Sequence, residues 1–387
     1  VLEYALSLQN LDIGGKMQVS RGVTCEYRRE PLGVVVGITP FNFPAMVPMW
    51  MIPIALAMGN SFVWKPSDKT PLTSLLLAEA LKEAGLPAGA FSVVQGGREA
   101  VEALCDHPTV QAIGFVGSSP VAKAVYVRAT SQGKRALCLG GAKNPIILVP
   151  DADEEMAAQG IAASFTGCAG QRCMAASVLL AVGGSDGKTN QIIDQIVQKV
   201  GQMLLGQDMG AIISKASLDK LNQGIARAQK EGAKILIDGR GKKPSSKEYS
   251  DGNWLGPTIL DGVQPKAEAA CDELFGPILS IVRCKNLSEA LEFENKSPFG
   301  NASSVFTTNG AIAEEVAHRS HAGMIGINIG VPVPREPFSF GGFNDSRFGD
   351  GDITGRGGVE FWSRLKKVTY KWSTQTHGSH HAKNWMS

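Results

Sequence analysis

A glycine-punctuated loop that ends at Cys173 carries the residues best suited to chemistry. It reads Ser164-Phe-Thr-Gly-Cys-Ala-Gly-Gln-Arg-Cys-Met-Ala175 and follows a predicted helix over 153–165. Its small residues let the backbone pass close to a bound substrate, and the guanidinium of Arg172 beside the sulfur favours a thiolate or holds a carboxylate. The pattern indicates a nucleophilic cysteine, with an ordinary buried cysteine as the alternative.

The elements that must position this loop follow an alternating pattern. From Pro31 onwards, short apolar runs are separated by helical stretches, which predicts an α/β fold with parallel sheets and crossover helices. In the first half we expect strands over 34–38, 62–65, 91–95, 113–117 and 135–139. In the second half we expect strands over 146–149, 177–182, 234–237, 278–282, 303–307 and 324–329, with helices over 190–205 and 218–231.

One helix of the first half has clear end signals. Thr70 is the expected N-cap, Pro71 the first helical residue and Gly85 the stop. Its predicted apolar face consists of Leu72, Leu75, Leu76 and Ala80.

Polar residues follow the predicted strands at the edge where ligands bind in such sheets. Asn42 lies on a proline-flanked turn, where its carboxamide is suited to holding an oxyanion or simply completes the turn. Lys65 and Asp68 fit ribose hydroxyls, or are solvated. The segment 117–122 opens a helix whose N-terminus suits a phosphate, although the GxGxxG spacing is absent.

Composition narrows the functional class. The 387 residues are 43% hydrophobic and 19% charged, with a formal net charge of +2, so no basic excess indicates a nucleic-acid partner. Seven cysteines without a CxxC pair predict a reducing compartment and no metal site. Prolines interrupt the longest apolar run, 41–58, and no basic-then-apolar leader is present, so we expect neither a membrane span nor an export signal.

Seven ordered motifs give the chain a family resemblance. They are Pro40-Phe-Asn-Phe-Pro44, Lys65-Pro-Ser67, Phe115-Val-Gly-Ser118, Leu139-Gly-Gly141, Gly170-Gln-Arg-Cys173, Glu273-Leu-Phe-Gly-Pro277 and Pro337-Phe-Ser-Phe-Gly-Gly342. Together they resemble the aldehyde dehydrogenase superfamily over nearly the whole chain. Four further segments resemble its CoA-acylating, methylmalonate-semialdehyde dehydrogenase branch: Gly141-Ala-Lys-Asn144, Gly170-Gln-Arg-Cys-Met-Ala175, Phe306-Thr-Thr-Asn-Gly310 and Pro332-Val-Pro-Arg-Glu-Pro-Phe338.

The resemblance implies a role for each matching residue. Cys173 matches the nucleophile and Asn42 the oxyanion-hole side chain. The cofactor NAD is expected at Thr39, Phe41, Lys65, Ser67, Asp68, Gly117, Ser118, Glu273 and Phe275. The substrate is expected at Arg172, Phe43 and Phe338.

The implied reaction is oxidation of malonate or methylmalonate semialdehyde through a Cys173 thioester, followed by decarboxylation and transfer to coenzyme A. Hydrolytic family members carry a glutamate where the motif alignment puts Cys138, so the usual base for activating water is missing. A hydrolytic dehydrogenase for another small aldehyde, or a non-catalytic family fragment, are the alternatives. The family also has a segment ahead of Val1, which implies an N-terminally truncated chain.

The resemblance also implies the domain organisation, the assembly and the location. Residues 1–14 end a cofactor-domain helix, 15–30 form an oligomerisation ribbon, 31–144 the NAD-binding domain and 145–346 the catalytic domain. Residues 347–363 return to the cofactor domain, and 364–387 form an oligomerisation strand and a polar tail. We expect a homodimer or homotetramer, because a monomer exposes the edges of the ribbon and the strand. The expected location is the cytoplasm, or the mitochondrial matrix in a eukaryote.

Overall fold

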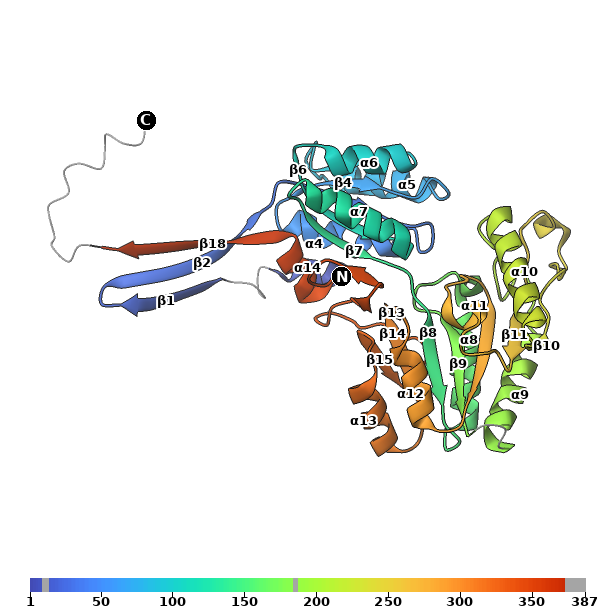
Figure 1. Cartoon of the computed structure of the whole chain (residues 1–387). Coiled ribbons are helices and arrows are strands. Elements are labelled where there is room, and N and C mark those ends of the chain that lie inside the picture. The colour runs from blue at the N-terminus through green and yellow to red at the C-terminus, as the bar shows by residue number, and fades with distance from the viewer. Residues whose placement is uncertain (9–13, 184–186, 373–387) are drawn as a thin grey trace, which may run out of the picture.

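A computed structural model of the chain describes residues 1–8, 14–183 and 187–372 and is built on two largely parallel sheets (Figure 1). The predicted polar tail, 373–383, lies outside the described residues. No described helix is long and apolar enough to cross a membrane.

The first sheet has six strands in the order β17-β7-β6-β3-β4-β5. Its five parallel strands are β3 (Val34–Ile38), β4 (Ser61–Lys65), β5 (Phe91–Val93), β6 (Val110–Val116) and β7 (Arg135–Leu139), and β17 (Arg347–Phe348) is antiparallel to β7. Its helices are α3 (Met46–Met49), α4 (Ile52–Ala57), α5 (Leu72–Glu83), α6 (Arg98–Asp106), α7 (Ser119–Ser131) and α14 (Gly355–Phe361), and α1 (Leu2–Leu6) contacts α4.

The second sheet has seven strands in the order β10-β11-β12-β9-β8-β14-β15. They are β8 (Asn144–Leu148), β9 (Ala176–Val182), β10 (Lys234–Ile237), β11 (Thr258–Asp261), β12 (Ile278–Cys284), β14 (Ala302–Phe306) and β15 (Met324–Ile327), and only β10 runs antiparallel to its neighbour. The accompanying helices are α8 (Glu154–Thr166), α9 (Gly187–Gly201), α10 (Lys215–Lys230), α11 (Glu268–Cys271), α12 (Leu287–Asn295) and α13 (Gly310–Arg319). Short pieces complete the chain: β13 (Phe299–Gly300), β16 (Phe343–Asn344), η1 (Gly167–Gly170) and η2 (Lys247–Tyr249).

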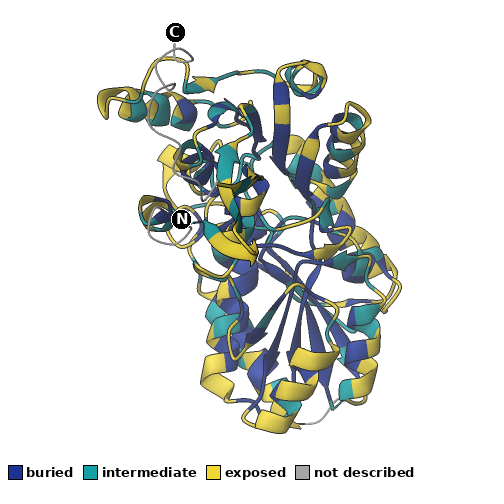
Figure 2. Ribbon diagram, turned by 90° about the vertical axis from the view of Figure 1, so that its left-hand side faces the viewer, coloured by how far each residue is buried: buried dark blue, intermediate teal, exposed yellow. Residues whose placement is uncertain are grey.

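Both sheets are covered on both faces, which explains why their strands are continuous apolar runs. On β3, Val35 and Val36 belong to different core clusters, and on β8 so do Ile146 and Ile147. Figure 2 shows the strands as buried and the outer sides of the helices as exposed. The predicted fold class is confirmed.

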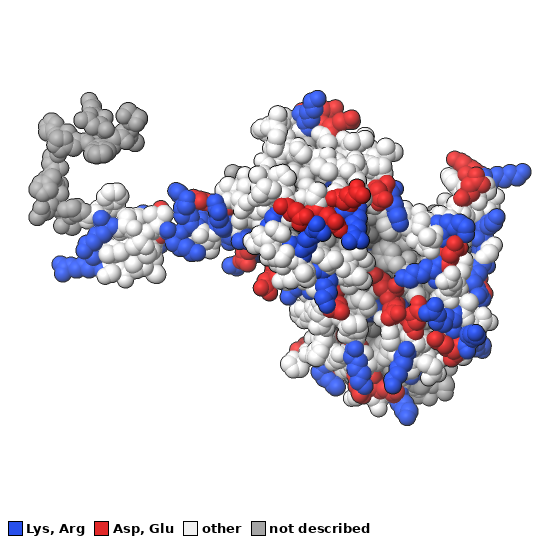
Figure 3. All heavy atoms as spheres, turned by 45° about the horizontal axis from the view of Figure 1, so that its top comes forward, with Lys and Arg blue, Asp and Glu red and all other residues white. Residues whose placement is uncertain are grey.

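The ribbon and the C-terminal strand form one projecting sheet. β1 (Gly15–Ser20), β2 (Val23–Pro31) and β18 (Ser363–Lys371) are antiparallel in the order β1-β2-β18 and extend away from the body (Figure 1). The ribbon and the strand pair with each other in one chain, and β1 and β18 are the two edge strands of this sheet, so each element still presents an outer edge, as expected. Residues 15–31 and 363–371 hold eight basic and two acidic side chains, and Figure 3 shows the basic ones gathered on this arm.

The apolar face predicted for α5 is wrong. Leu72, Leu75 and Leu76 are 71%, 50% and 67% exposed. The inward face instead follows Ser74, whose hydroxyl donates to the carbonyl of Pro71, and continues through Leu77 and Leu81, which pack against the core. A run of consecutive leucines fits two helical faces equally well, so periodicity alone selected the wrong one. Thr70 is not the cap either: Pro71 holds that position without a side-chain hydrogen bond.

Candidate active site

The loop that carries Cys173 connects α8 to β9 and has a tightly constrained backbone. The carboxylate of Asp153 caps α8 by accepting from the backbone N–H of Met156 at 2.8 Å. After α8, residues 168–170 all have positive φ. A Cβ added to Gly170 would lie 2.1 Å from the carbonyl oxygen of Gly276, so only glycine lets these two loops approach so closely.

Two asparagines hold the backbone of the nucleophile. The Nδ2 of Asn144, at the start of β8, donates to the Cys173 carbonyl at 2.7 Å and to the Ala175 carbonyl at 3.1 Å. The Nδ2 of Asn301 donates to the same Cys173 carbonyl at 3.1 Å. Neither residue was predicted from the sequence to have a role in the site. Asn144 lies in a quoted motif, whereas nothing in the sequence around Asn301 marks it.

The Cys173 thiol lies in a half-buried position between opposing charges. Burial, followed by the negative charge of Glu273, raises its pKa to about 12. The positive charge of Arg172 and the backbone N–H groups of Met174 and Cys173 act in the other direction. The sulfur is therefore protonated at neutral pH in this state, and the same two N–H groups are placed to stabilise a negative charge.

Arg172 folds back onto the end of α8. Its Nη2 donates to the carbonyls of Ala163 and Ser164 at 3.2 and 2.9 Å. Burial lowers its pKa, opposed by the nearby thiols of Cys168 and Cys173. The Nε of Arg172 is buried and has no hydrogen-bond partner in the described part of the chain, which leaves one donor for a ligand.

The loop 273–277 brings a carboxylate to the same place. The Oε1 of Glu273 accepts from the backbone N–H of Ala142 at 2.9 Å. The carboxylate lies against the Cα of Gly141, where an added Cβ would be 2.5 Å from Oε2. Burial raises the pKa of Glu273, opposed by the Ala142 N–H and by Lys143.

An aromatic contact links this loop to the six-stranded sheet. Phe275 has a positive φ of 63°, and its ring meets that of Phe41 edge-on at 6.0 Å. The Nζ of Lys69 lies 5.6 Å from the centre of the Phe41 ring.

The other expected cofactor residues lie at the carboxyl edge of the six-stranded sheet. Thr39 is buried and its hydroxyl accepts from the Trp64 indole at 2.8 Å, while burial lowers the pKa of Lys65, opposed by Asp68. Ser67 accepts from the backbone N–H of Lys69 at 3.2 Å.

The turn into α7 combines a tight backbone with a free helix end. A Cβ on Gly117 would lie 2.6 Å from the Phe115 ring. Ser118 is the N-cap but makes no side-chain cap bond, which leaves the first N–H groups of α7 available to an anion. Ser119 was not predicted from the sequence as a site residue. Its hydroxyl donates to the Asp345 carbonyl at 2.6 Å and accepts from the Gly141 N–H at 2.9 Å.

The residues expected to hold the oxyanion and the substrate differ in how far they are buried. Asn42 is half-buried on the turn after β3, and Phe43, with a φ of 54°, packs against the same core cluster as Cys173. Phe338 is 74% exposed, whereas the ring of Phe340, two residues further on, is buried and packs at a tilt against Trp50, with ring centroids 4.4 Å apart. The roles of Asn42, Phe43 and Phe338 stay predictions.

Cys138 does not lie where the motif alignment put it. Its side chain is fully buried in the cluster that contains Cys105, while Leu137 and Leu139 point to the other face of β7, into the cluster that Cys173 contacts. Burial, and secondarily Cys105, raises the pKa of the Cys138 thiol well above its usual range. The neighbour of Cys138 on β7 that faces the Cys173 side of the sheet is therefore the apolar Leu139. The described part of the site still has no carboxylate on this strand.

Comparison with known proteins decides the family. The model of the aldehyde dehydrogenase family matches residues 1–368. The chain belongs to the aldehyde dehydrogenase family. The carboxyl-edge residues, the Cys173 loop and the Glu273 loop described above are thus parts of an aldehyde dehydrogenase fold.

Similar members of the aldehyde dehydrogenase family carry related names. Malonate-semialdehyde dehydrogenase 1 of Geobacillus kaustophilus is 42% identical over 375 residues, covering 95% of this chain and 75% of that protein. The mitochondrial acylating methylmalonate-semialdehyde/malonate-semialdehyde dehydrogenase of Rattus norvegicus is 38% identical, covering 97% and 70%. The crystal structure of methylmalonate-semialdehyde dehydrogenase from Oceanimonas doudoroffii has a TM-score of 0.93 at 38% identity, covering 96% and 77%.

Proposed function

We propose that this aldehyde dehydrogenase oxidises malonate or methylmalonate semialdehyde with NAD, through a thioester on Cys173 that coenzyme A resolves after loss of carbon dioxide. The observation that carries the proposal is the environment of Cys173. Its carbonyl is held by Asn144 and Asn301, its sulfur faces two backbone N–H groups, and Arg172 lies beside it with one unused donor. The names of the similar proteins support the same substrate class.

The carboxyl edge of the six-stranded sheet fits a dinucleotide. The uncapped N-terminus of α7 suits a phosphate, because its first N–H groups point outward without a side-chain partner from Ser118. Lys65 and Glu273 suit ribose hydroxyls as donor and acceptor. A similar structure from Sinorhizobium meliloti, with a TM-score of 0.93 and 39% identity, is complexed with NAD. When bound, NAD accepts the hydride from the aldehyde carbon.

The residues of this chain then divide the reaction between them. The Cys173 sulfur loses its proton and forms a bond to the aldehyde carbon, and the resulting oxyanion accepts from Asn42 and the Cys173 N–H. Departure of hydride re-forms the carbonyl as a thioester. Arg172 holds the substrate carboxylate until the carbon–carbon bond breaks and carbon dioxide leaves. The electron pair of that bond stays on the α-carbon as a thioester enolate, which takes up a proton from solvent. The CoA thiol then adds to the thioester and Cys173 departs, recovering a proton.

Coenzyme A is favoured over water because β7 supplies no carboxylate to activate water. A positioned general base contributes roughly 100- to 10,000-fold to such a step. Thiols ionise several units below water and are strong nucleophiles, so CoA needs less help. Glu273 is the remaining nearby carboxylate and is already engaged by Ala142.

The experiment that tests the proposal is a product analysis with saturating aldehyde and NAD, with and without CoA. We expect acyl-CoA and NADH in equal amounts, and much slower formation of the free acid when CoA is left out. Free acid formed as fast without CoA would show a hydrolytic enzyme, and no NADH with any small aldehyde would show a non-catalytic family member.

Three further properties belong to the proposal. Asp68 is exposed beside Lys65, and its carboxylate repels a 2′-phosphate, so binding titrations should show NAD bound more tightly than NADP. The projecting sheet of β1, β2 and β18 exposes Met17, Val19 and Leu365, which we assign to contact with a second copy. The resulting homodimer or homotetramer is measurable by light scattering. The proposed location is the cytoplasm or, in a eukaryote, the mitochondrial matrix.

A further inference from the structure

A cavity of about 410 Å³ lies in the seven-stranded domain, apart from the cofactor residues. Its lining is mostly apolar and comes from β12, α11, α12 and the start of β14, including Val282, Ala270, Phe293 and Ala302. This volume falls within the range of small-molecule pockets.

A buried cation lines this cavity. Lys143 is 5% exposed, and its Nζ has no hydrogen-bond partner among the residues that the structure describes. Burial lowers its pKa to about 8, opposed by the charges of Glu273 and Asp272. An ammonium group in this position is poorly compensated, and a carboxylate placed in the cavity would supply the missing partner.

A second ionisable side chain of the cavity does not cancel that charge. Glu294 is 6% exposed, and neither carboxylate oxygen meets a hydrogen-bond partner within the described chain. Burial raises its pKa to about 7, opposed by the nearby hydroxyls of Ser320 and Ser303. Much of the Glu294 population is therefore neutral at physiological pH, and a neutral carboxyl group donates to an anion instead of repelling it.

The cavity is connected to the active site through three consecutive residues. The Ala142 N–H holds Glu273, Lys143 lines the cavity, and Asn144 holds the Cys173 carbonyl while its Oδ1 accepts from the Ala302 N–H at 3.1 Å. Asn301, the other residue that holds Cys173, also lines the cavity. Any shift of Lys143 toward an occupant therefore acts on the nucleophile and on Glu273.

We propose that this cavity is a second binding site, for small carboxylates with an apolar body, and that its occupant alters the reactivity of Cys173 through residues 142–144. The apolar lining takes the body of the ligand and Lys143 pairs with its carboxylate. At the exposed rim, Lys266 favours entry of an anion and Glu289 opposes it, while Lys296 is already paired with Glu292 at 2.6 Å.

The test uses Cys271, which lines the cavity and is half-buried, as a reporter. Alkylation by iodoacetamide is followed at each cysteine by mass spectrometry while 3-phenylpropanoate, 3-phenylpropanol or 2-phenylethylamine is added. We expect the carboxylate alone to protect Cys271, with a Kd on the order of millimolar and about tenfold slower alkylation at ten times that concentration. Cys25, in the ribbon, should react at an unchanged rate.

Two variants separate the cavity from the substrate site. Lys143→Met keeps the length of the side chain and should abolish the protection of Cys271, whereas Arg172→Gln should leave it intact. Equal protection by the alcohol or the amine, no saturable protection, or protection lost in Arg172→Gln would overturn the binding site. The ligand series decides this in the wild-type chain even if Lys143→Met does not fold.

The coupling is measured in the same samples. The alkylation rate of Cys173 should change by at least about twofold with bound 3-phenylpropanoate in the wild type and in Arg172→Gln. It should not change in Lys143→Met. A protected Cys271 with an unaltered Cys173 rate would overturn the coupling.

Discussion

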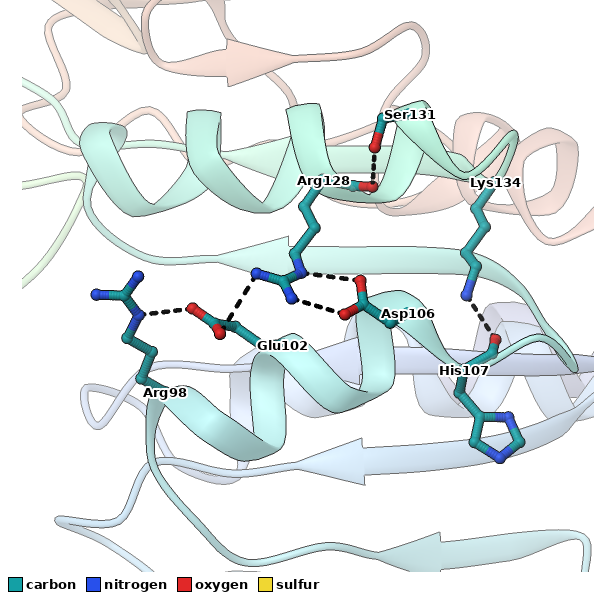
Figure 4. A network of polar contacts seen from close by, with 7 residues as sticks. All are labelled: Arg98, Glu102, Asp106, His107, Arg128, Ser131 and Lys134. Atoms are coloured by element: carbon teal, nitrogen blue, oxygen red, sulfur yellow. Dashed lines mark hydrogen bonds and ion pairs between the residues drawn. The ribbon is translucent and has the colours of Figure 1, made fainter.

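The two parallel sheets bury different kinds of side chain. Within the six-stranded sheet, Lys65 at the end of β4 is the one buried polar residue among the described strands, and a network of exposed charges lies outside the sheet, on α6 and α7. There Arg128 pairs with Asp106 and Glu102, and Glu102 with Arg98 (Figure 4). The strands of the seven-stranded sheet instead bury Asn144, Thr258, Ser280, Ser303 and Ser304.

The difference teaches where function resides. Polar groups that are buried in a core cost free energy unless they are paired, so a sheet that carries them has another use for them. In the seven-stranded sheet, Asn144 holds the Cys173 carbonyl, whereas Thr258 accepts from the Gly239 N–H and Ser280 donates to the Ala269 carbonyl. The six-stranded sheet needs polar groups only at its carboxyl edge, where the cofactor is expected.

The largest expected effect is a difference in turnover between substitutions of two cysteines, Cys173 in the active-site loop and Cys138 in the six-stranded sheet. Cys173→Ala should lower turnover by at least about a thousandfold, because the thioester cannot form. Cys138→Ala should leave turnover within about threefold, since this thiol faces an apolar cluster away from Cys173. NADH formation measures both. Similar losses in the two variants would contradict the assignment of the nucleophile.

The next largest effect is on the stability of the apolar six-stranded sheet. Cys138→Glu should destabilise the fold by about 3–5 kcal/mol, because it buries a carboxylate among apolar residues. Burial would raise the pKa of this glutamate, so the loss should be smaller at pH 5 than at pH 8.

Chemical denaturation measures the free energy of unfolding, with Cys138→Val as the control that keeps the site apolar. A stable Cys138→Glu variant with rapid CoA-independent acid formation would show that this position does face the nucleophile.

A smaller effect is expected in the polar interior. The folded-state pKa of Glu294 is raised from 4.5 to about 7, so its contribution to stability is fully present below pH 4.5 and is lost as the pH rises through 7. The effect of Glu294→Gln on the free energy of unfolding should therefore be more favourable at pH 8 than at pH 5, by on the order of 2–3 kcal/mol. The exposed Glu292→Gln on the same helix is the control. Parallel pH profiles for wild type and Glu294→Gln would refute the shift.

The smallest effect should come from the surface network. Arg128→Gln removes two ion pairs, but all their members are at least one third exposed, so the melting temperature should change by no more than about 2 °C. The change should shrink further in high salt, because salt screens exposed charges. A large, salt-independent loss would mean that the network holds α6 and α7 in place.

Much of the architecture could be predicted because parallel strands are continuous apolar runs. The strand over 34–38 and the strand over 135–139 were placed to the residue. The face of α5 was wrong because three leucines in succession carry no directional information. Element ends shifted by a few residues elsewhere, as with β5, which ends at Val93 instead of Gln95.

The site was predictable only where a motif names a residue. Cys173 and Glu273 meet at one place, as their motifs imply. The orientation of Cys138 could not be predicted, because a shift of one residue along a strand moves a side chain to the other face of the sheet, and a motif does not show which face each residue takes. Asn301 and Ser119 could not be predicted as site residues, because their partners, the Cys173 carbonyl and the Gly141 N–H, are backbone atoms far away in sequence.

The close approach of Gly170 to Gly276 has a mechanical consequence. There is no room for even a methyl group between the two glycines. The loop of the nucleophile and the loop of Glu273 therefore cannot slide past each other and must move together. The carboxyl edge of the six-stranded sheet meets the Glu273 loop through the edge-on pair of Phe41 and Phe275 and through the Ala142 N–H, which donates to Glu273. A movement of the Glu273 loop away from the six-stranded sheet would separate these two rings and would carry the loop of Cys173 with it.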